Sequence, residues 1–237
     1  PVEYIPVTDY TASVTAFRVG DLDMVWFGGL TGVQARLQVD DSRAIIQRDI
    51  DDQFHSVFIA NKNSGLVPID DVAGLSQLEG SSFTFGSASS TSGRLMPQYY
   101  LGQAGVELDE FNGEPGFSGS HTTTIELVEA GSYEAGVLNE QVWLSSVESG
   151  DVDLERVQVI WRTPAFYDYH WVIRPDVVER YGEDFIDQVT RAFTKLDINN
   201  PDHKNILDLF SAQAFIVTEN DNYLQIETVG QEVGLIN

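Results

Sequence analysis

The sequence predicts an α/β protein of two lobes, and two patterns carry this prediction. Short apolar runs typical of strands alternate with helical segments about ten residues long, which is the order of elements expected when helices cover a sheet. Between residues 61 and 68 the composition changes to Asn, Lys, Ser, Gly and Pro, which indicates a crossing out of the first lobe. We therefore expect largely parallel sheets, with residues 1–63 and 169–237 in lobe I and residues 64–168 in lobe II.

The first lobe opens on an alternating run, residues 2–7, that predicts a strand. Thr8 and Asp9 can then cap a helix that ends at Gly20. The apolar residues 23–29 predict a buried strand that turns at a glycine pair. The other elements expected in this lobe are a helix at 31–37, strands at 44–48, 54–60 and 171–174, and helices at 177–196 and 203–210.

The second lobe centres on a loop of small hydroxyl residues, 86–93, between an apolar run at 82–85 and a helical run at 94–101. A strand that passes through such a loop into a helix exposes backbone N–H groups and hydroxyl donors at the positive end of the helix dipole. This pattern predicts an anion-binding site, although an ordinary Ser/Thr helix cap would have the same pattern. The other elements expected are helices at 71–78, at 121–130 and after 139–140, strands at 133–138 and 157–162, and a return crossing at 163–169.

The composition excludes several classes of function. The 37 acidic and 13 basic residues give a formal net charge of −24, so nucleic acid and anionic lipid would be repelled at long range. No apolar run of about eighteen residues is present to span a membrane, and the absence of cysteine excludes disulfide and thiolate chemistry. The four histidines lack metal-ligand spacing, so we expect no metal and no cofactor. An anionic ligand would need a dense local set of donors.

Six short motifs have the order and spacing of one family. They are residues 6–10 (Pro-Val-Thr-Asp-Tyr), 26–31 (Trp-Phe-Gly-Gly-Leu-Thr), 56–61 (Ser-Val-Phe-Ile-Ala-Asn), 90–93 (Ser-Thr-Ser-Gly), 118–121 (Ser-Gly-Ser-His) and 159–164 (Val-Ile-Trp-Arg-Thr-Pro). Over nearly its whole length the chain resembles the phosphonate/phosphite-type (PhnD-like) substrate-binding proteins of bacterial ABC importers. Within them it is most similar to the branch described as selenate-binding.

The resemblance implies a two-lobed type II periplasmic-binding-protein fold, with two crossings and a ligand cleft between the lobes. It also implies an exported, periplasmic, monomeric protein. Such a protein closes by hinge motion on a small tetrahedral oxyanion (phosphonate, phosphite or selenate-like) and delivers it to the membrane permease of an ABC importer. The family's first strand and helix have no counterpart in this sequence, so we expect that N-terminal part of lobe I to be missing.

Carried over position by position, the resemblance makes Ser90, Thr91 and Ser92 donors to the oxygens of the anion. His121 would be a further donor at the second helix start, and Tyr10 matches a first-lobe tyrosine that reaches the same oxygens. Without the resemblance, His121 would be read as a capping or surface histidine, and Tyr10 as an apolar contact of an amphipathic helix.

Two acids, Glu140 and Asp168, match residues that hold the ammonium group in family members that bind aminoalkylphosphonates. Read alone, both would be solvated surface acids. Phe54, followed by His55, stands where members that bind organic phosphonates have a tyrosine, so the identity of the anion is open. His55 fits equally a ligand contact and a satisfied position in the core or at its rim.

Two other functions fit the same residues. A hydrolase or transferase could use a serine with His121 and an acid, but residues 116–119 lack the Gly-X-Ser-X-Gly spacing of a nucleophile elbow. Adjacent hydroxyls also suit distributed anion binding better than one activated nucleophile. An effector-sensing receptor lobe pair would have the same fold, but the sequence contains no DNA-binding helix pair and no membrane anchor. We therefore expect a binding protein and not an enzyme.

Overall fold

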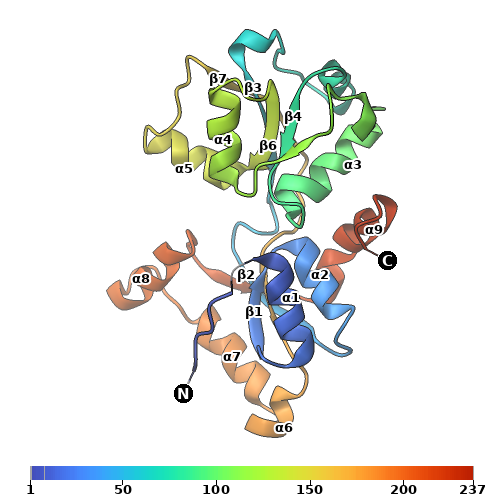
Figure 1. The fold of residues 1–237 in the computed structure, drawn as a ribbon. Helices are drawn as coiled ribbons and strands as arrows, with labels where there is room; N and C mark the ends of the chain where they lie inside the picture. Colours follow the sequence, from blue (N-terminus) through green and yellow to red (C-terminus); the bar gives the residue numbers. More distant parts are fainter. Residues whose placement is uncertain (1, 8, 237) are drawn as a thin grey trace. The chain divides into compact units, whose positions relative to one another are not determined.

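The structure of this chain, a computed structural model, describes residues 2–7 and 9–236. The chain divides into two compact units (Figure 1). The first unit contains residues 2–54, 166–230 and 236, and the second contains residues 55–165 and 231–235. Each unit has a sheet and helices of its own.

The first unit is built on a four-stranded sheet with the order β1-β8-β2-β9. Its strands are β1 (Met24–Phe27), β2 (Arg43–Arg48), β8 (His170–Ile173) and β9 (Phe215–Val217). β8 pairs antiparallel with both β1 and β2, and β9 pairs antiparallel with β2. The prediction of a largely parallel sheet was therefore wrong for this unit. The chain that returns after residue 165 places β8 between β1 and β2, and both of these strands run in the opposite direction to β8.

Helix α1 (Tyr10–Val19) begins and ends where the sequence predicted. The Asp9 carboxylate accepts from the Ala12 N–H at 2.8 Å, and Gly20 ends the helix with φ 87°, which glycine adopts without steric cost. Thr8, the other predicted cap, lies outside the described residues. The other helices of this unit are α2 (Gly29–Arg36), α6 (Val177–Tyr181), α7 (Phe185–Thr194), α8 (Pro201–Leu209), η5 (Asn220–Tyr223) and α9 (Leu224–Glu232).

Residues 2–7 form no strand, contrary to the prediction from their alternating pattern. Their side chains are exposed, and Val2 and Tyr4 retain 100% and 86% of their accessible surface. Within the described sheet, β1 has β8 as its only neighbour. An alternating sequence forms a strand only where a partner takes up its backbone N–H and C=O groups, so this run stays extended outside the sheet.

The second unit is built on a five-stranded mixed sheet with the order β5-β4-β6-β3-β7. β4 runs parallel to β5 and β6, whereas β3 pairs antiparallel with β6 and β7. The sequence analysis placed β3 in lobe I, but its six residues are all buried in this second sheet. The strands are β3 (Ser56–Asn61), β4 (Phe83–Phe85), β5 (Gly116–Phe117), β6 (Ala135–Asn139) and β7 (Val157–Arg162).

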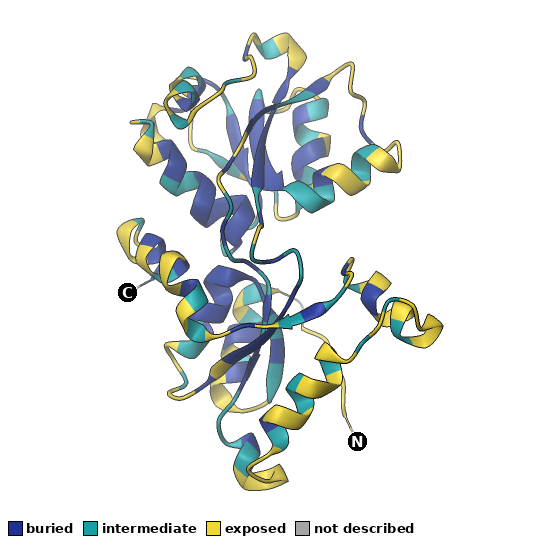
Figure 2. Cartoon of the chain, turned by 180° about the vertical axis from the view of Figure 1, so that it is seen from behind, coloured by how far each residue is buried: buried dark blue, intermediate teal, exposed yellow. Residues whose placement is uncertain are grey.

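Helices lie on both faces of the second sheet, and Figure 1 shows α3 and α4 on opposite sides of it. The helices are η1 (Lys62–Ser64), η2 (Val72–Leu78), η3 (Thr91–Leu95), α3 (Met96–Gln103), η4 (Leu108–Glu110), α4 (His121–Glu129) and α5 (Glu140–Glu148). η3 is a π-helical turn that continues directly into α3. The central strands of each unit are largely buried, whereas the edge strands β5 and β9 are partly exposed and the helices expose their outer faces (Figure 2).

We expect Gly32→Ala to destabilise the protein by about 1–3 kcal/mol. A Cβ on Gly32, in α2, would lie 2.4 Å from the ring of His170, which is completely buried in β8. Gly102→Ala, in α3, is the matched control, because nothing lies within 4 Å of its Cβ position and alanine should favour the helix by about 0.5–1 kcal/mol. Denaturant unfolding measures both effects, and equal stabilities of the two variants would contradict the packing of α2 on His170.

Candidate functional site

The loop of small hydroxyl residues connects β4 to η3 and α3. The Gly86 N–H donates to the Gly93 carbonyl at 2.8 Å, which closes the loop. The Ser90 hydroxyl caps the helix by accepting from the Gly93 N–H at 2.9 Å. The Ser92 hydroxyl is buried and has no hydrogen-bond partner, and Thr91 beside it is buried too. Three adjacent hydroxyls therefore stand at a helix N-terminus, and that of Ser92 has its hydrogen-bonding capacity unused.

His121 is the first residue of α4 and lies against this loop. A Cβ on Gly93 would be 3.2 Å from His121 Cε1, so the glycine is what lets the ring approach. The Asn139 N–H donates to His121 Nδ1 at 3.3 Å, which places the proton of the neutral ring on Nε2. Burial lowers the pKa of His121 to about 4. At neutral pH the ring is therefore uncharged and has one N–H to donate.

Glu140 begins α5 directly after β6, and it is already ion-paired. Arg162 donates from Nε to Glu140 Oε1 and from Nη2 to Oε2, the second bond at 2.8 Å. The Glu140 N–H donates to the His55 carbonyl at 3.2 Å, and His55 Nδ1 donates to the Thr163 carbonyl at 2.7 Å. The sheet therefore brings Glu140 and His55 together, and each is tied to the end of β7 or to the chain just beyond it.

The six predicted residues of the second unit lie at one end of its sheet. β4 and β6 are parallel, and their carboxyl ends lead into the hydroxyl loop and into α5. Ser56, at the start of β3, pairs with Asn139 at the end of β6, so His55 reaches the same end. The carboxyl ends of parallel strands, together with helix N-termini, are the usual place for an anion in α/β sheets.

In the first unit the structure gathers Tyr10, Phe54 and Asp168 around Tyr169. The hydroxyl oxygens of Tyr10 and Tyr169 are 3.5 Å apart, and the ring centres of Phe54 and Tyr169 are 5.7 Å apart, edge to face. Burial raises the pKa of both tyrosines. Both hydroxyls therefore stay protonated at neutral pH and can donate.

Asp168 is a buried cap of α2 and not a solvated acid. Gly28, at the N-cap position of α2, has no side chain to cap the helix. The Gly29 N–H instead donates to Asp168 Oδ1 at 2.8 Å, across a separation of 139 residues. The carboxylate thus lies at the positive end of the helix dipole, where it stabilises α2.

Arg48 was missed by the sequence analysis, although it lies among the aromatic residues of the first unit. It donates to both oxygens of the buried Asp51 carboxylate, at 2.8 and 2.6 Å. Its guanidinium carbon lies 5.3 Å from the centre of the Tyr169 ring, 5.7 Å from that of Trp26 and 5.9 Å from that of Phe54. The available signal was a basic residue at the end of an apolar strand with an acid three residues later.

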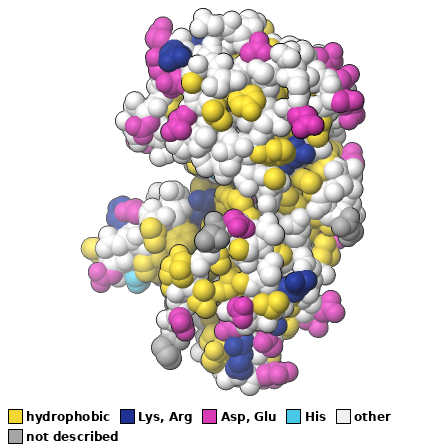
Figure 3. All heavy atoms as spheres, in the orientation of Figure 1, with side chains coloured by type: hydrophobic (Ala, Val, Ile, Leu, Met, Phe, Trp, Pro, Cys, Tyr) yellow, Lys and Arg dark blue, Asp and Glu magenta, His cyan; other side chains and the backbone are white. Residues whose placement is uncertain are grey.

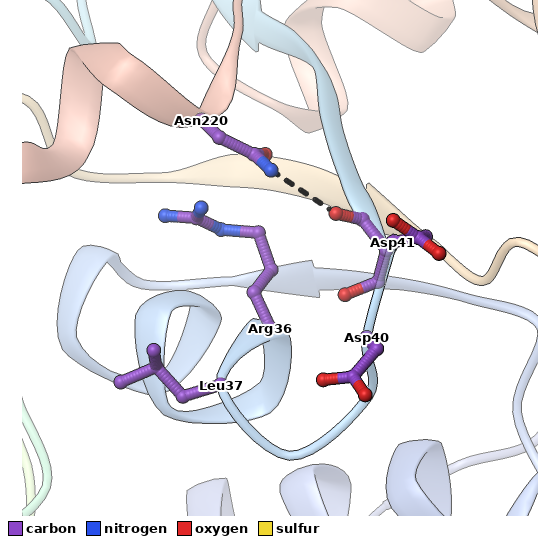
Figure 4. A pocket seen from close by; sticks show the side chains of 6 residues that line it. Arg36, Leu37, Asp40, Asp41 and Asn220 are labelled. Atoms are coloured by element: carbon purple, nitrogen blue, oxygen red, sulfur yellow. Dashed lines mark hydrogen bonds between the residues drawn. The ribbon is translucent and has the colours of Figure 1, made fainter.

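A separate cavity of about 620 Å³ in the first unit contains none of the predicted site residues. Figure 4 shows the Arg36 guanidinium pointing away from the carboxylates of Asp40 and Asp41, while Asn220 donates to the Ser42 carbonyl. The two carboxylates disfavour an anion there. Among the residues that the structure describes, no group of three or more His, Asp or Glu side chains is placed to hold a metal ion.

Two α/β units, one on an antiparallel and one on a mixed sheet, have the architecture of the type II periplasmic-binding-protein fold. A binding-protein component of a phosphonate ABC transporter from Pseudomonas aeruginosa superimposes with a TM-score of 0.72 at 22% identity, covering 93% of this chain and 72% of that one. The periplasmic aliphatic sulphonate-binding protein of Escherichia coli gives 0.66 at 14% identity, covering 96% and 80%. At these identities the likeness shows the fold alone.

Residues 1–223 match the family described as "ABC transporter, phosphonate, periplasmic substrate-binding protein", and the chain belongs to this family. A "Probable ABC transporter phosphite binding protein" of Prochlorococcus marinus (strain MIT 9301) is 50% identical over 99% of this chain and 80% of its own length. A solved structure from the same organism and strain, in complex with methylphosphonate, has a TM-score of 0.94 at 49% identity, covering 99% of this chain and 86% of that one.

Membership of this family confirms three predictions from the sequence. The chain has the predicted fold, it is the substrate-binding component of an ABC importer of the phosphonate class, and it is a binding protein and not an enzyme. The hydrolase and transferase alternatives are therefore set aside. The roles of the individual site residues stay predictions.

We expect the stability of the protein to fall as the pH is lowered from about 6.5 to 5, and His121→Gln to reduce this dependence. Burial lowers the folded-state pKa of His121 to about 4 and that of His170 to about 3, whereas both rings take up protons near pH 6.5 in the unfolded chain. The unfolded state therefore binds more protons in this range, so the unfolding free energy rises with pH.

Unfolding titrations at several pH values measure this dependence as the number of protons taken up on unfolding. The variant should take up about one proton fewer than the wild type near pH 5. The same slope in both proteins would contradict the neutral state of His121 in the fold.

Proposed function

We propose that the ligand is a small tetrahedral phosphorus oxyanion, phosphite or a short alkylphosphonate such as methylphosphonate. The observation that carries this proposal is the buried Ser92 hydroxyl without a partner, which stands at a helix N-terminus beside two further hydroxyls, in a loop whose glycines lie against the His121 ring. The relatives support the choice of anion, because one is described as phosphite-binding and a solved one holds methylphosphonate.

In this proposal Ser90, Thr91, Ser92 and His121 donate to the oxygens of the anion. Each hydrogen bond from a neutral donor to a charged oxygen contributes about 1.5–3 kcal/mol when it is well formed. Tyr10 stays a predicted further donor, since its hydroxyl remains protonated. Phe54 has no hydrogen-bond donor, so its ring can make only an apolar contact. The Nδ1 of His55 already donates to the Thr163 carbonyl.

The two acids favour a ligand without an ammonium group, because both are engaged within the protein. Glu140 is paired with Arg162, and Asp168 caps α2 through the Gly29 N–H. A ligand ammonium would have to compete with these partners. We therefore propose that Glu140 and Asp168 position Arg162 and α2 and do not bind a cationic group of the ligand.

We also propose a cellular context from the family. The protein would work in the periplasm as a monomer and deliver its ligand to the membrane permease of an ABC importer. Selenate, which the sequence resemblance also allows, remains a competing anion. The described part of the chain contains no helix that is long and apolar enough to cross a membrane.

Ser92→Ala and Ser90→Ala should separate binding from stability. The Ser92 hydroxyl has no partner, so its removal should leave the unfolding free energy of the ligand-free protein nearly unchanged and weaken methylphosphonate binding about tenfold or more. Ser90→Ala also removes the cap on Gly93 and should cost about 1 kcal/mol of stability. Calorimetric titration and denaturant unfolding measure the two effects. Wild-type affinity in Ser92→Ala would remove this hydroxyl from the site.

A thermal-shift panel at matched ionic strength should rank the ligands. Phosphite and methylphosphonate should raise the melting temperature more than 2-aminoethylphosphonate, because at equal concentration a ligand that binds only the folded state stabilises it more when its affinity is higher. Arg162→Ala is the informative variant, since it frees Glu140 and should narrow this difference. A larger shift with 2-aminoethylphosphonate in the wild type would contradict the argument from the engaged acids, and a shift with selenate alone would replace the proposed ligand.

A further inference from the structure

Arg94 differs from the other Lys and Arg side chains of the second unit because it is buried. Of the four Lys and Arg side chains between residues 55 and 165, Lys62 and Arg156 are exposed, and Arg162 is exposed and ion-paired. Arg94 is only 9% exposed. In the described part of the chain it forms no ion pair, and its Nη1 is buried without a hydrogen-bond partner.

Two phenylalanine rings hold the guanidinium of Arg94. Its central carbon lies 4.3 Å from the centre of the Phe85 ring and 4.8 Å from that of Phe117. Phe85 ends β4, which leads into the hydroxyl loop, and Phe117 lies in β5, which leads into the segment before His121. The Ser118 N–H donates to the Phe85 carbonyl at 3.0 Å and joins the two strand ends. Aromatic faces attract a cation, so the guanidinium is held at the ends of the two strands that lead into these loops.

This arrangement is unfavourable for the ligand-free fold. A largely buried charge has lost part of its hydration, and among the described residues Arg94 has gained no ion-pair partner in return. Burial lowers the pKa of Arg94 to about 10, which still leaves the guanidinium charged at neutral pH. The fold therefore keeps a charge at this point that its own residues do not neutralise.

Apart from the helix N-termini at the hydroxyl loop and at His121, the described part of the second unit gives an anion little electrostatic help. The chain has a formal net charge of −24, and Asp and Glu side chains are spread over the visible face in Figure 3. The donors at the hydroxyl loop are neutral, including His121 at neutral pH. Neutral donors bind any tetrahedral oxyanion of the right size, so they discriminate poorly between one negative charge and two.

We infer that Arg94, held against the rings of Phe85 and Phe117, supplies the counter-charge for a dianion at the hydroxyl loop and sets a preference for dianions over monoanions of the same shape. This inference rests on the proposed function, since it needs an anion at that loop. It gives Arg94 two opposite effects. The residue destabilises the ligand-free protein, and it strengthens binding because the dianion provides the missing counter-ion.

The test compares two ligands of one shape in alkaline buffer, above the second pKa of methylphosphonate, where methylphosphonate is a dianion and methanesulfonate a monoanion. Calorimetric titration of the full chain should show that Arg94→Met weakens methylphosphonate binding about tenfold or more and methanesulfonate binding much less. Arg94→Lys keeps the charge and should keep most of the affinity. Arg156→Met removes an exposed charge from the same unit and should change either affinity by less than about twofold.

A second readout separates this role from a structural one. Ligand-free Arg94→Met should melt at or above the wild-type temperature, because it removes an uncompensated buried charge. The inference is overturned if Arg94→Met binds methylphosphonate like the wild type, if it loses both ligands equally, or if it melts lower while Arg94→Lys binds no better. If methanesulfonate does not bind the wild type, the methylphosphonate affinities of Arg94→Met and Arg94→Lys alone test the role of Arg94. A wild-type protein that binds neither methylphosphonate nor phosphite would overturn the proposed function itself.

Discussion

The backbone hydrogen bond between Gly86 and Gly93 fixes the geometry on which the candidate site of the second unit depends. It joins the end of β4 to the first turn of the following helix, so the hydroxyl residues between them are held in a closed loop. The two glycines approach closely, since a Cβ on Gly86 would lie 3.3 Å from Gly93 Cα. The same lack of side chains leaves room for the His121 ring beside Gly93. A bulkier residue at either position would separate the loop, the helix start and the imidazole at once.

A second constraint is electrostatic, because this chain is strongly acidic and belongs to a family of anion-transport proteins. Its carboxylates must not repel the anion at the site. The structure meets it locally, because the two acids among the predicted site residues and a third acid near Phe54 have partners. Glu140 is held by Arg162, Asp51 by Arg48, and Asp168 by the first N–H of α2. Removing an exposed acid far from the loop changes little at short range, because salt screens such charges within about 10 Å. Local pairing therefore matters more for the ligand than the total charge.

The parts of the fold that short-range signals determine could be predicted from the sequence. α1 has its cap at Asp9 and its stop at Gly20, and β7 has the predicted bounds, because local residues specify a helix end or an apolar run. Strand direction was wrong, because inserting β8 between β1 and β2 is a pairing across more than a hundred residues. The short strand β9 and the helix α9 were missed for a related reason, since neither has a long apolar period of its own.

The candidate site also has parts that local residues determine and parts that depend on long-range contacts. The small hydroxyl residues and the His that follows Ser-Gly-Ser form a local pattern, and the sequence showed them. The partners of the two acids are long-range: Asp168 caps a helix 139 residues earlier, and Arg162 reaches Glu140 from another strand. The burial of Arg94 could not be predicted from the sequence, because an arginine in a helical run is normally a solvated residue. What it touches depends on how β4 and β5 place two phenylalanines.

The position of β8 also has a consequence for synthesis of the protein. The sheet of the second unit uses strands from one continuous stretch of chain, residues 56–162, so it can form as soon as that stretch has left the ribosome. The first sheet cannot, because β1 and β2 precede that stretch and wait for β8 and β9, which follow it. Until then the buried faces of β1 and β2 lack their central partner. β1 and β2 therefore stay exposed to mispairing for longer than the strands of the second sheet.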